Sequence, residues 1–240
     1  MIPAAKTTIV PVHFFRSGIP ALLMLTLLFS LVHIRAGRGK EFSMSKQPVR
    51  ILAFGDSLTA GWGVVPPSSV PACLETALRE KGIAVTFINA GIPGDTTAGA
   101  IKRFEAALAC DPDMVILELG ANDNLQAIPT DRTAANLDAM LQVLSQRNIP
   151  TLLAGICLLR DLGSEYNAGF QALFEELATR YEAVFYPDYL AGVAGNPEYL
   201  QRDGLHPNLR GTQEIARRLL PVVTDMLANF GEPGADKLQP

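Results

Sequence analysis

Four polar side chains in this sequence have the types needed for attack on a carbonyl group. Ser57 stands in Gly-Asp-Ser directly after an apolar run, while Asp203 and His206 stand three residues apart near the end of the chain. A histidine that an aspartate orients can take the proton of a serine hydroxyl, which makes that serine a nucleophile. Asn122, which also follows an apolar run, can donate a hydrogen bond to the oxyanion that such an attack creates. These residues together indicate acyl transfer through a serine ester.

The histidine count decides which residue could act as the base. Of the three histidines, His13 and His33 lie in the N-terminal segment, so His206 is the one imidazole in the rest of the chain that could serve as a general base. A lone histidine is more often a loop or core residue without a chemical task. Here, however, the spacing lets the Asp203 carboxylate accept a hydrogen bond from Nδ1 and leaves Nε2 free for Ser57. We therefore predict a triad of Ser57, Asp203 and His206.

Three hydrogen-bond donors are predicted to hold the oxyanion: the backbone N–H of Ser57, the backbone N–H of Gly94 and the side-chain amide of Asn122. Gly94 follows Pro93, and a residue without Cβ lets the main chain approach a substrate closely. The sequence alone leaves simpler interpretations open, because Gly94 could be an ordinary turn glycine and Asn122 a loop cap.

The predicted site residues follow runs that have the pattern of parallel strands. Five short apolar runs lack polar alternation, which is typical of strands covered on both faces. These runs are residues 49–54, 85–88, 114–119, 151–156 and 183–186. Segments with helical spacing of apolar residues alternate with them, at 70–81, 97–109, 131–147, 166–181 and 211–229. This alternation predicts a three-layer α/β sandwich around a parallel sheet, with ligands bound beyond the carboxyl ends of the strands.

Composition favours one folded domain that acts on a small molecule. The chain has 240 residues, of which 48% are hydrophobic and 18% charged, and this is enough to bury a full core. The net charge of −4 and the scattered basic residues argue against a nucleic-acid partner. We predict an N-terminal signal or anchor-like segment at 1–45, a catalytic domain at 46–232 and a tail at 233–240.

The N-terminal segment has an apolar run at 19–34 with Lys6 and Arg16 before it, as a signal peptide or a signal anchor would. The run is short for a comfortable membrane span, and basic residues follow it directly. We predict export to the periplasm or anchoring in a membrane through this segment. A start at Met44 is the open alternative, and it would place the protein in the cytoplasm.

The three cysteines are Cys73, Cys110 and Cys157, an odd number that cannot all pair. None has the spacing of a zinc site and none stands beside a histidine, so we expect small buried apolar residues rather than metal ligands. One disulfide stays open if the protein is exported.

In order and spacing, the segments GDSLTAGWG, NAGIPGDTT, GANDN and DGLHPN resemble the sequence blocks of the SGNH (GDSL) hydrolases. The likeness covers residues 50–227 and is greatest to the branch of bacterial arylesterases and the acyl-CoA thioesterase/lysophospholipase. It implies a flavodoxin-like sheet of strand order 2-1-3-4-5, no metal or other cofactor, and hydrolysis of carboxylic esters through an acyl-enzyme. Position by position, it gives Ser57, Asp203 and His206 the triad roles and gives Gly94 and Asn122 the oxyanion roles.

The chain departs from the thioesterase pattern at positions that concern the substrate. Trp62 stands in place of a smaller aromatic residue, Gly91 stands in place of a serine, and residues 124–130 differ from the loop that senses the acyl chain. We therefore take Trp62, Leu125 and Ile128 as candidates for substrate binding. The resemblance also implies that Asp56 braces the turn beside the nucleophile rather than reacting.

Several substrate classes stay open at this point. Aryl or short-to-medium acyl esters are expected, with thioesters and lysophospholipids as further members of the same class. A carbohydrate acetyl-esterase of the same fold is an alternative. A catalytically silent binding module is a remote one, because a fold alone does not guarantee activity.

Overall fold

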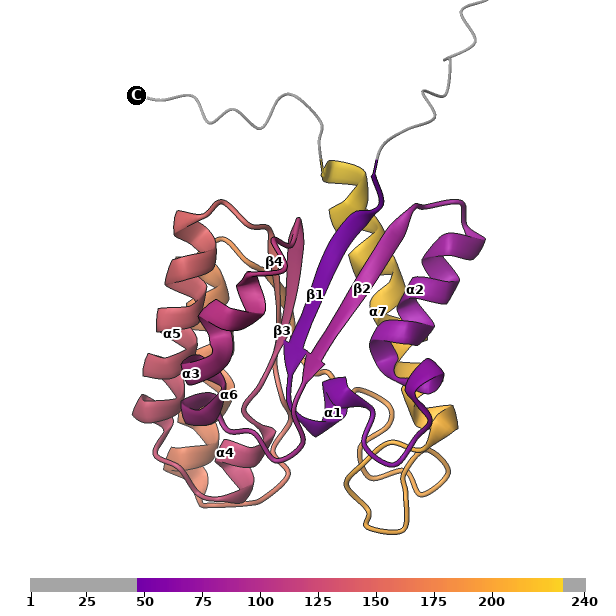
Figure 1. The fold of residues 1–240 in the computed structure, drawn as a ribbon. Coiled ribbons are helices and arrows are strands. Elements are labelled where there is room, and N and C mark those ends of the chain that lie inside the picture. Colours follow the sequence, from indigo (N-terminus) through magenta and orange to yellow (C-terminus); the bar gives the residue numbers. More distant parts are fainter. Residues whose placement is uncertain (1–46, 231–240) are drawn as a thin grey trace, which may run out of the picture. The chain divides into compact units, whose positions relative to one another are not determined.

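A parallel five-stranded sheet lies at the centre of the structure, a computed structural model that describes residues 47–230 (Figure 1). Its strands are β1 (Val49–Gly55), β2 (Val85–Gly91), β3 (Met114–Glu118), β4 (Thr151–Ala154) and β5 (Val184–Tyr186). They are hydrogen-bonded in the order β2-β1-β3-β4-β5. This is the order that the resemblance implies, and the predicted α/β fold class is confirmed.

Helices cover both faces of the sheet and complete the three layers. The long helices are α2 (Val70–Glu80), α3 (Thr97–Leu108), α5 (Thr130–Gln146), α6 (Ser164–Arg180) and α7 (Leu209–Asn229). α2 lies beside α7 on one face, and α3, α5 and α6 lie together on the other (Figure 1). Because both faces are covered, the central strands have no side that water could reach.

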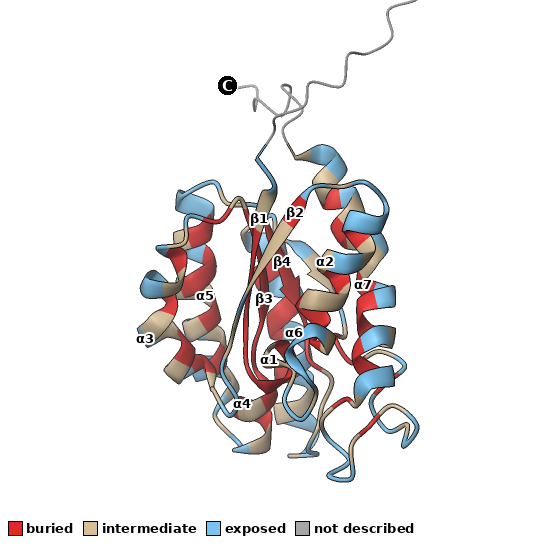
Figure 2. Cartoon of the chain, turned by 45° about the vertical axis from the view of Figure 1, so that its right-hand side comes forward, coloured by how far each residue is buried: buried red, intermediate tan, exposed pale blue. Residues whose placement is uncertain are grey.

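The core lies between the sheet and the inward stripes of these helices (Figure 2). Strands β3 and β4 are buried at every residue, and β1 is buried at all but its first two residues. On α5 the buried apolar stripe consists of Leu137, Met140, Leu141 and Leu144. Their spacing follows the helical repeat, so burial of this stripe fixes the helix against the sheet. A sheet held in this way gives the loops at its carboxyl edge a rigid base.

Two short helices interrupt the simple alternation of five strands and five helices that the sequence predicts. α1 (Ser57–Ala60) and α4 (Ala121–Leu125) each follow a strand directly, and a 3₁₀ turn, η1 (Pro66–Ser68), precedes α2. Such short elements show no helical periodicity, and for that reason the pattern missed them. β2 runs on to Gly91, three residues beyond its predicted end, because it pairs with β1 along its whole length.

The three cysteines are free thiols at the edge of the core, partly buried rather than fully buried as expected. Burial raises the pKa of all three thiols, and for Cys157 it raises the pKa to about 12. Because the thiolate is the reactive form of cysteine, these residues are poor nucleophiles at neutral pH.

Within residues 47–230, no helix is long and apolar enough to cross a membrane. The predicted signal or anchor-like segment at 1–45 and the tail at 233–240 lie outside the described residues. Export, anchoring and a start at Met44 therefore stay predictions.

Candidate active site

The carboxyl ends of β1, β2 and β3 meet at one edge of the sheet. Gly55, the last residue of β1, lies opposite Gly91 of β2 and Glu118 of β3. A Cβ at Gly55 would collide with the Thr59 hydroxyl and with the Glu118 backbone, so this close approach requires glycine. Ser57 follows as the first residue of α1 and is only 8% exposed.

The loop before α7 brings Asp203 and His206 to Ser57. His206 Nε2 lies 3.0 Å from Ser57 Oγ, and His206 Nδ1 lies 2.7 Å from Asp203 Oδ2. Partial burial of Asp203 opposes its ionisation, but hydrogen bonds from the His206 ring and from the backbone N–H groups of Leu205 and His206 outweigh it and lower the pKa of Asp203 to about 2. Asp203 is therefore an anion at neutral pH, and an anion at Nδ1 fixes the tautomer in which Nε2 can accept the Ser57 proton.

Gln201 holds the histidine loop against the segment that follows α1. Its backbone N–H donates to His206 O at 2.8 Å, and its side-chain Nε2 donates to Pro207 O at 2.9 Å and to Trp62 O at 2.6 Å. Asn208 then caps the first turn of α7 and fixes where that helix begins. The sequence reasoning missed Gln201, because a single glutamine in a loop carries no pattern.

Gly94 and Asn122 lie on the segments after β2 and β3. Gly94 has a φ of +79°, and no atom would touch a Cβ there, so the left-handed backbone alone calls for glycine. Asn122 Nδ2 donates to Asp56 Oδ2 at 3.0 Å and to Asp95 O at 2.9 Å. The amide therefore joins the nucleophile turn to the loop after β2, and an oxyanion would compete with these two acceptors for its hydrogen atoms.

Two carboxyl groups lie beneath Ser57, and both are fully buried. Asp56 Oδ1 accepts from the backbone N–H of Leu58 at 2.9 Å and so caps α1, while Glu118 Oε2 accepts from the Thr59 hydroxyl at 2.7 Å. Among the described residues, Glu118 Oε1 has no hydrogen-bond partner. Burial raises the pKa of both groups, and the nearby Asp56 charge raises the pKa of Glu118 further. We call Asp56, Thr59 and Glu118 the buried floor.

Glu118 is a site residue that the sequence reasoning missed, although a signal for it was present. It stands inside the apolar run 114–119, where every other residue is apolar. A charged residue in a strand covered on both faces must have a polar partner or give up its charge. Such a residue next to a predicted site is therefore a candidate for a supporting role.

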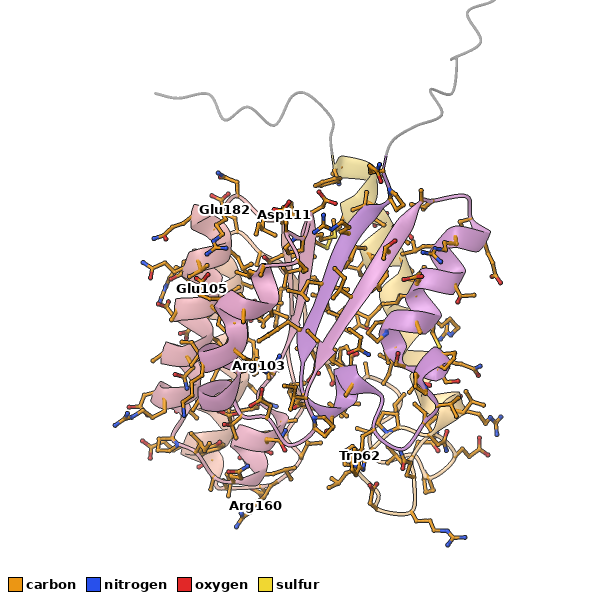
Figure 3. The ribbon with its side chains drawn as sticks, viewed as in Figure 1. Trp62, Arg103, Glu105, Asp111, Arg160 and Glu182 are labelled. Carbon is orange, nitrogen blue, oxygen red and sulfur yellow. The ribbon has the colours of Figure 1, made fainter. Side chains whose placement is uncertain are left out.

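Arg103 of α3 joins the strand ends to the loop after β2 (Figure 3). Its guanidinium donates to Asp95 Oδ2 at 2.7 Å, to Ala90 O at 2.8 Å and to Gly55 O at 2.8 Å. It also lies over the Phe54 ring, 4.1 Å from the ring centroid. Its five donors suit it to hold several acceptors at fixed angles, and lysine could not reproduce this geometry.

The three candidates for substrate binding occupy different places. Trp62 is 53% exposed, and its ring centroid lies 6.3 Å from that of His206 (Figure 3). Leu125 ends α4, and Ile128 lies partly buried in the connection to α5, where its carbonyl oxygen accepts from the Tyr166 hydroxyl at 2.9 Å. Of the three, Trp62 is therefore the one that stands beside the histidine.

Ordinary side chains can supply the chemistry of acyl transfer at this edge of the sheet. Ser57 has a base within hydrogen-bond distance, the base has an anion behind it, and amide donors stand nearby. Among residues 47–230, no group of three or more His, Cys, Asp or Glu residues is placed to hold a metal ion.

Known proteins share both the sequence pattern and the fold. Residues 53–214, more than half of the chain, match the GDSL-like lipase/acylhydrolase family. An arylesterase of Vibrio mimicus is 34% identical over 173 residues, which are 72% of this chain and 86% of that protein. Thioesterase 1/protease 1/lysophospholipase L1 of Escherichia coli strain K12 is 32% identical over 184 residues, 76% of this chain and 83% of that protein. The solved structure of AlinE4, an SGNH-hydrolase family esterase, is 40% identical with a TM-score of 0.64 and covers 77% of this chain and 99% of its own.

Proposed function

Because this chain belongs to the GDSL-like lipase/acylhydrolase family and is a carboxylic ester hydrolase, we propose that Ser57, His206 and Asp203 carry its reaction. The observation that carries the proposal is the unbroken line of hydrogen-bond contacts from Asp203 through His206 to Ser57 Oγ, at 2.7 Å and 3.0 Å. A serine with a positioned imidazole and a carboxylate behind it is the arrangement that makes a hydroxyl nucleophilic.

In the first half of the reaction, Ser57 Oγ attacks the ester carbonyl while His206 Nε2 takes the hydroxyl proton. Negative charge develops on the carbonyl oxygen, and the backbone N–H groups of Ser57 and Gly94 with the Asn122 amide stabilise it. His206 then gives its proton to the leaving oxygen, the bond between carbonyl carbon and leaving oxygen breaks, and the alcohol departs. Ser57 is left as an acyl ester.

In the second half, a water molecule takes the place of the alcohol. His206 removes a proton from this water as its oxygen attacks the acyl carbon, and the same donors hold the second oxyanion. The bond to Ser57 Oγ then breaks, Ser57 recovers its proton from His206, and the carboxylic acid is released. Asp203 stays an anion throughout and stabilises the imidazolium that forms twice in each cycle.

Small-molecule esters are the proposed substrates, and two relatives guide the choice among them. One carries the name arylesterase and the other carries the names thioesterase and lysophospholipase. A panel of p-nitrophenyl esters from acetyl to palmitoyl, with the matching acyl-CoA thioesters and acetylated sugars, would separate these activities. High activity on acetylated sugars with none on longer acyl esters would favour the carbohydrate esterase instead.

The triad assignment is tested by Ser57→Ala with Ser69→Ala as a matched control. Ser69 is also a buried serine at a helix start, but its hydroxyl donates to Pro66 O. Ser57→Ala should lose nearly all p-nitrophenyl ester turnover and all labelling by a fluorophosphonate probe, while Ser69→Ala keeps both. Appreciable turnover by a folded Ser57→Ala variant would overturn the assignment.

We also propose that the apolar run at 19–34 directs export or anchors the protein. The mass of the mature protein from its native host, measured on the intact chain, decides this. A protein that begins at Met44 would contradict it.

A further inference from the structure

An unusual set of exposed apolar side chains surrounds the histidine side of the site. Among the described residues, Trp62, Val65, Leu205 and Leu209 are large apolar side chains that are 36–66% exposed. Trp62 and Val65 follow α1, whereas Leu205 and Leu209 flank His206 in the sequence. We call these four residues the apolar rim.

Contacts show that the two halves of the apolar rim belong together. The Trp62 ring lies 6.3 Å from the His206 ring, and the two planes are inclined by 49°. Gln201 Nε2 binds the backbone oxygens of Trp62 and Pro207 at the same time. The segment that carries Trp62 is thus held against the loop that carries His206, although the two are far apart in the sequence. Figure 3 shows Trp62 at this end of the fold.

The reaction identifies which part of the ester must lie here. The leaving oxygen has to come within hydrogen-bond distance of His206 Nε2, because that atom protonates it. The oxyanion has to face Gly94 and Asn122, which lie on other segments. The alcohol part of the ester therefore begins beside His206, whose ring has Trp62 as its aromatic neighbour.

The shape of the apolar rim favours one class of alcohol. Trp62 offers a half-exposed indole beside an imidazole rather than a buried side chain. A rigid aromatic ring can stack on such a face and loses little conformational freedom in doing so. A flexible alkyl chain of equal area would lose more.

We propose that the apolar rim is the leaving-group site and that Trp62 selects esters of aromatic alcohols by stacking. The proposal rests on the triad assignment above, because only that assignment tells which side of the ester faces His206. It makes Trp62 a specificity-determining residue that touches the substrate without taking part in proton transfer.

Binding without turnover provides the first test, because Trp62 is the single tryptophan of the chain. In the Ser57→Ala variant, titration with benzyl acetate should change the tryptophan fluorescence to saturation, and cyclohexylmethyl acetate should bind more weakly. The two esters share one acyl group, and their alcohols are alike in size and acidity. Equal responses to both esters, or a response to phosphatidylcholine vesicles with none to benzyl acetate, would overturn the proposal.

Kinetics of Trp62→Leu and Trp62→Phe provide the second test. Trp62→Leu should lower kcat/KM for benzyl acetate relative to cyclohexylmethyl acetate by about threefold to tenfold, and Trp62→Phe should keep most of the wild-type ratio. Val184→Ala is the control, because Val184 is another exposed apolar residue but lies on β5, and its ratio should not change. An unchanged ratio in Trp62→Leu contradicts the proposal.

Failure of the two proposals can be told apart. Turnover by Ser57→Ala would contradict the triad assignment. The fluorescence titration measures binding near Trp62 and does not depend on turnover. If Ser57→Ala is inactive but binds the two esters equally well, the triad assignment stands and only the proposed leaving-group site is contradicted.

Discussion

The buried floor and the apolar rim lie on two sides of the same serine and reverse the usual distribution of side chains. Asp56 and Glu118 are carboxyl groups without access to water, whereas Trp62 is a large apolar residue that is 53% exposed. Each arrangement costs stability, because charged forms are disfavoured by burial and apolar surface is disfavoured in water. This difference in burial leads us to propose that the two regions have different tasks. In our proposal the floor holds the turn that carries Ser57, and the rim acts on the choice of ester.

If this division holds, changes on the floor side should affect all esters alike, whereas changes in the apolar rim should affect their ranking. Asn122→Ala is expected to have the largest effect, because it removes a proposed oxyanion donor and the link between Asp56 and the loop after β2. We expect kcat to fall by about 10²–10³-fold for every ester in the panel, with little change in KM.

The control for this prediction is Asn136→Ala. Asn136 is also half-buried, but its side-chain amide donates to the Thr97 hydroxyl, at 3.0 Å, and not to a residue of the nucleophile turn. Its kcat should stay near the wild-type value. A fall in kcat for Asn122→Ala that differs strongly between aryl and alkyl esters would break the division between the two regions.

Arg103→Met is expected to lower kcat by a smaller factor, and this factor should again be the same for every ester. The variant keeps an apolar stem of similar length but loses the guanidinium over the Phe54 ring and the donors to Gly55, Ala90 and Asp95. The loop after β2 is then no longer tied to the strand ends. A small displacement of positioned groups lowers the rate strongly, and we expect kcat to fall by about tenfold or more.

Added guanidinium ion should restore part of the kcat of Arg103→Met, which a purely structural loss would not allow. Arg180→Met is the matched control, because Arg180 pairs with Asp138 on the surface. A lower Tm with an unchanged kcat in Arg103→Met would limit this arginine to a structural role.

Glu118→Gln tests the buried floor through the pH dependence of stability, and its effect on kcat should be the smallest of the three variants. Burial raises the folded-state pKa of Glu118, so the folded protein binds its proton more tightly than the unfolded chain does. The stabilisation from this group is then complete below the unfolded pKa and is lost as pH rises through the folded pKa, at no more than about 1.4 kcal/mol per pH unit.

Glutamine does not titrate, so Glu118→Gln should gain stability relative to the wild type between about pH 5 and about pH 8. Urea unfolding at the two pH values measures this change, and a constant difference in unfolding free energy would contradict it. The ranking of esters should stay the same in this variant.

The sequence pointed to the proposed triad more directly than to the residues around it. Ser57, Asp203 and His206 stand out because their types and order suit one reaction, and the histidine count left few alternatives. The contacts that the supporting residues make are visible only after folding, although Glu118 stood out as a charged residue in an apolar run. Glu118 meets Thr59 because β1 and β3 pair in one register, with Gly55 opposite Glu118.

The same limit explains the other residues that the pattern missed. Arg103 looks like an ordinary polar position on an amphipathic helix, and its role appears only when α3 lies against the ends of β1 and β2. Gln201 contacts the backbone oxygen of Trp62 across 139 residues. Sequence spacing reports the local repeat of an element, but it does not report which distant backbone oxygen a side chain will meet.

The contact between His206 and Ser57 joins residues 149 positions apart. α2 and α7, which follow the two residues in the chain, lie side by side on one face of the sheet. Because contacts of such long range form only after the intervening chain has been ordered, regain of esterase activity during refolding reports on the docking of the last helix. Until α7 has docked on the sheet, the loop before it has no fixed base on which to hold His206 against Ser57, so the proposed triad is incomplete even when the sheet has already formed.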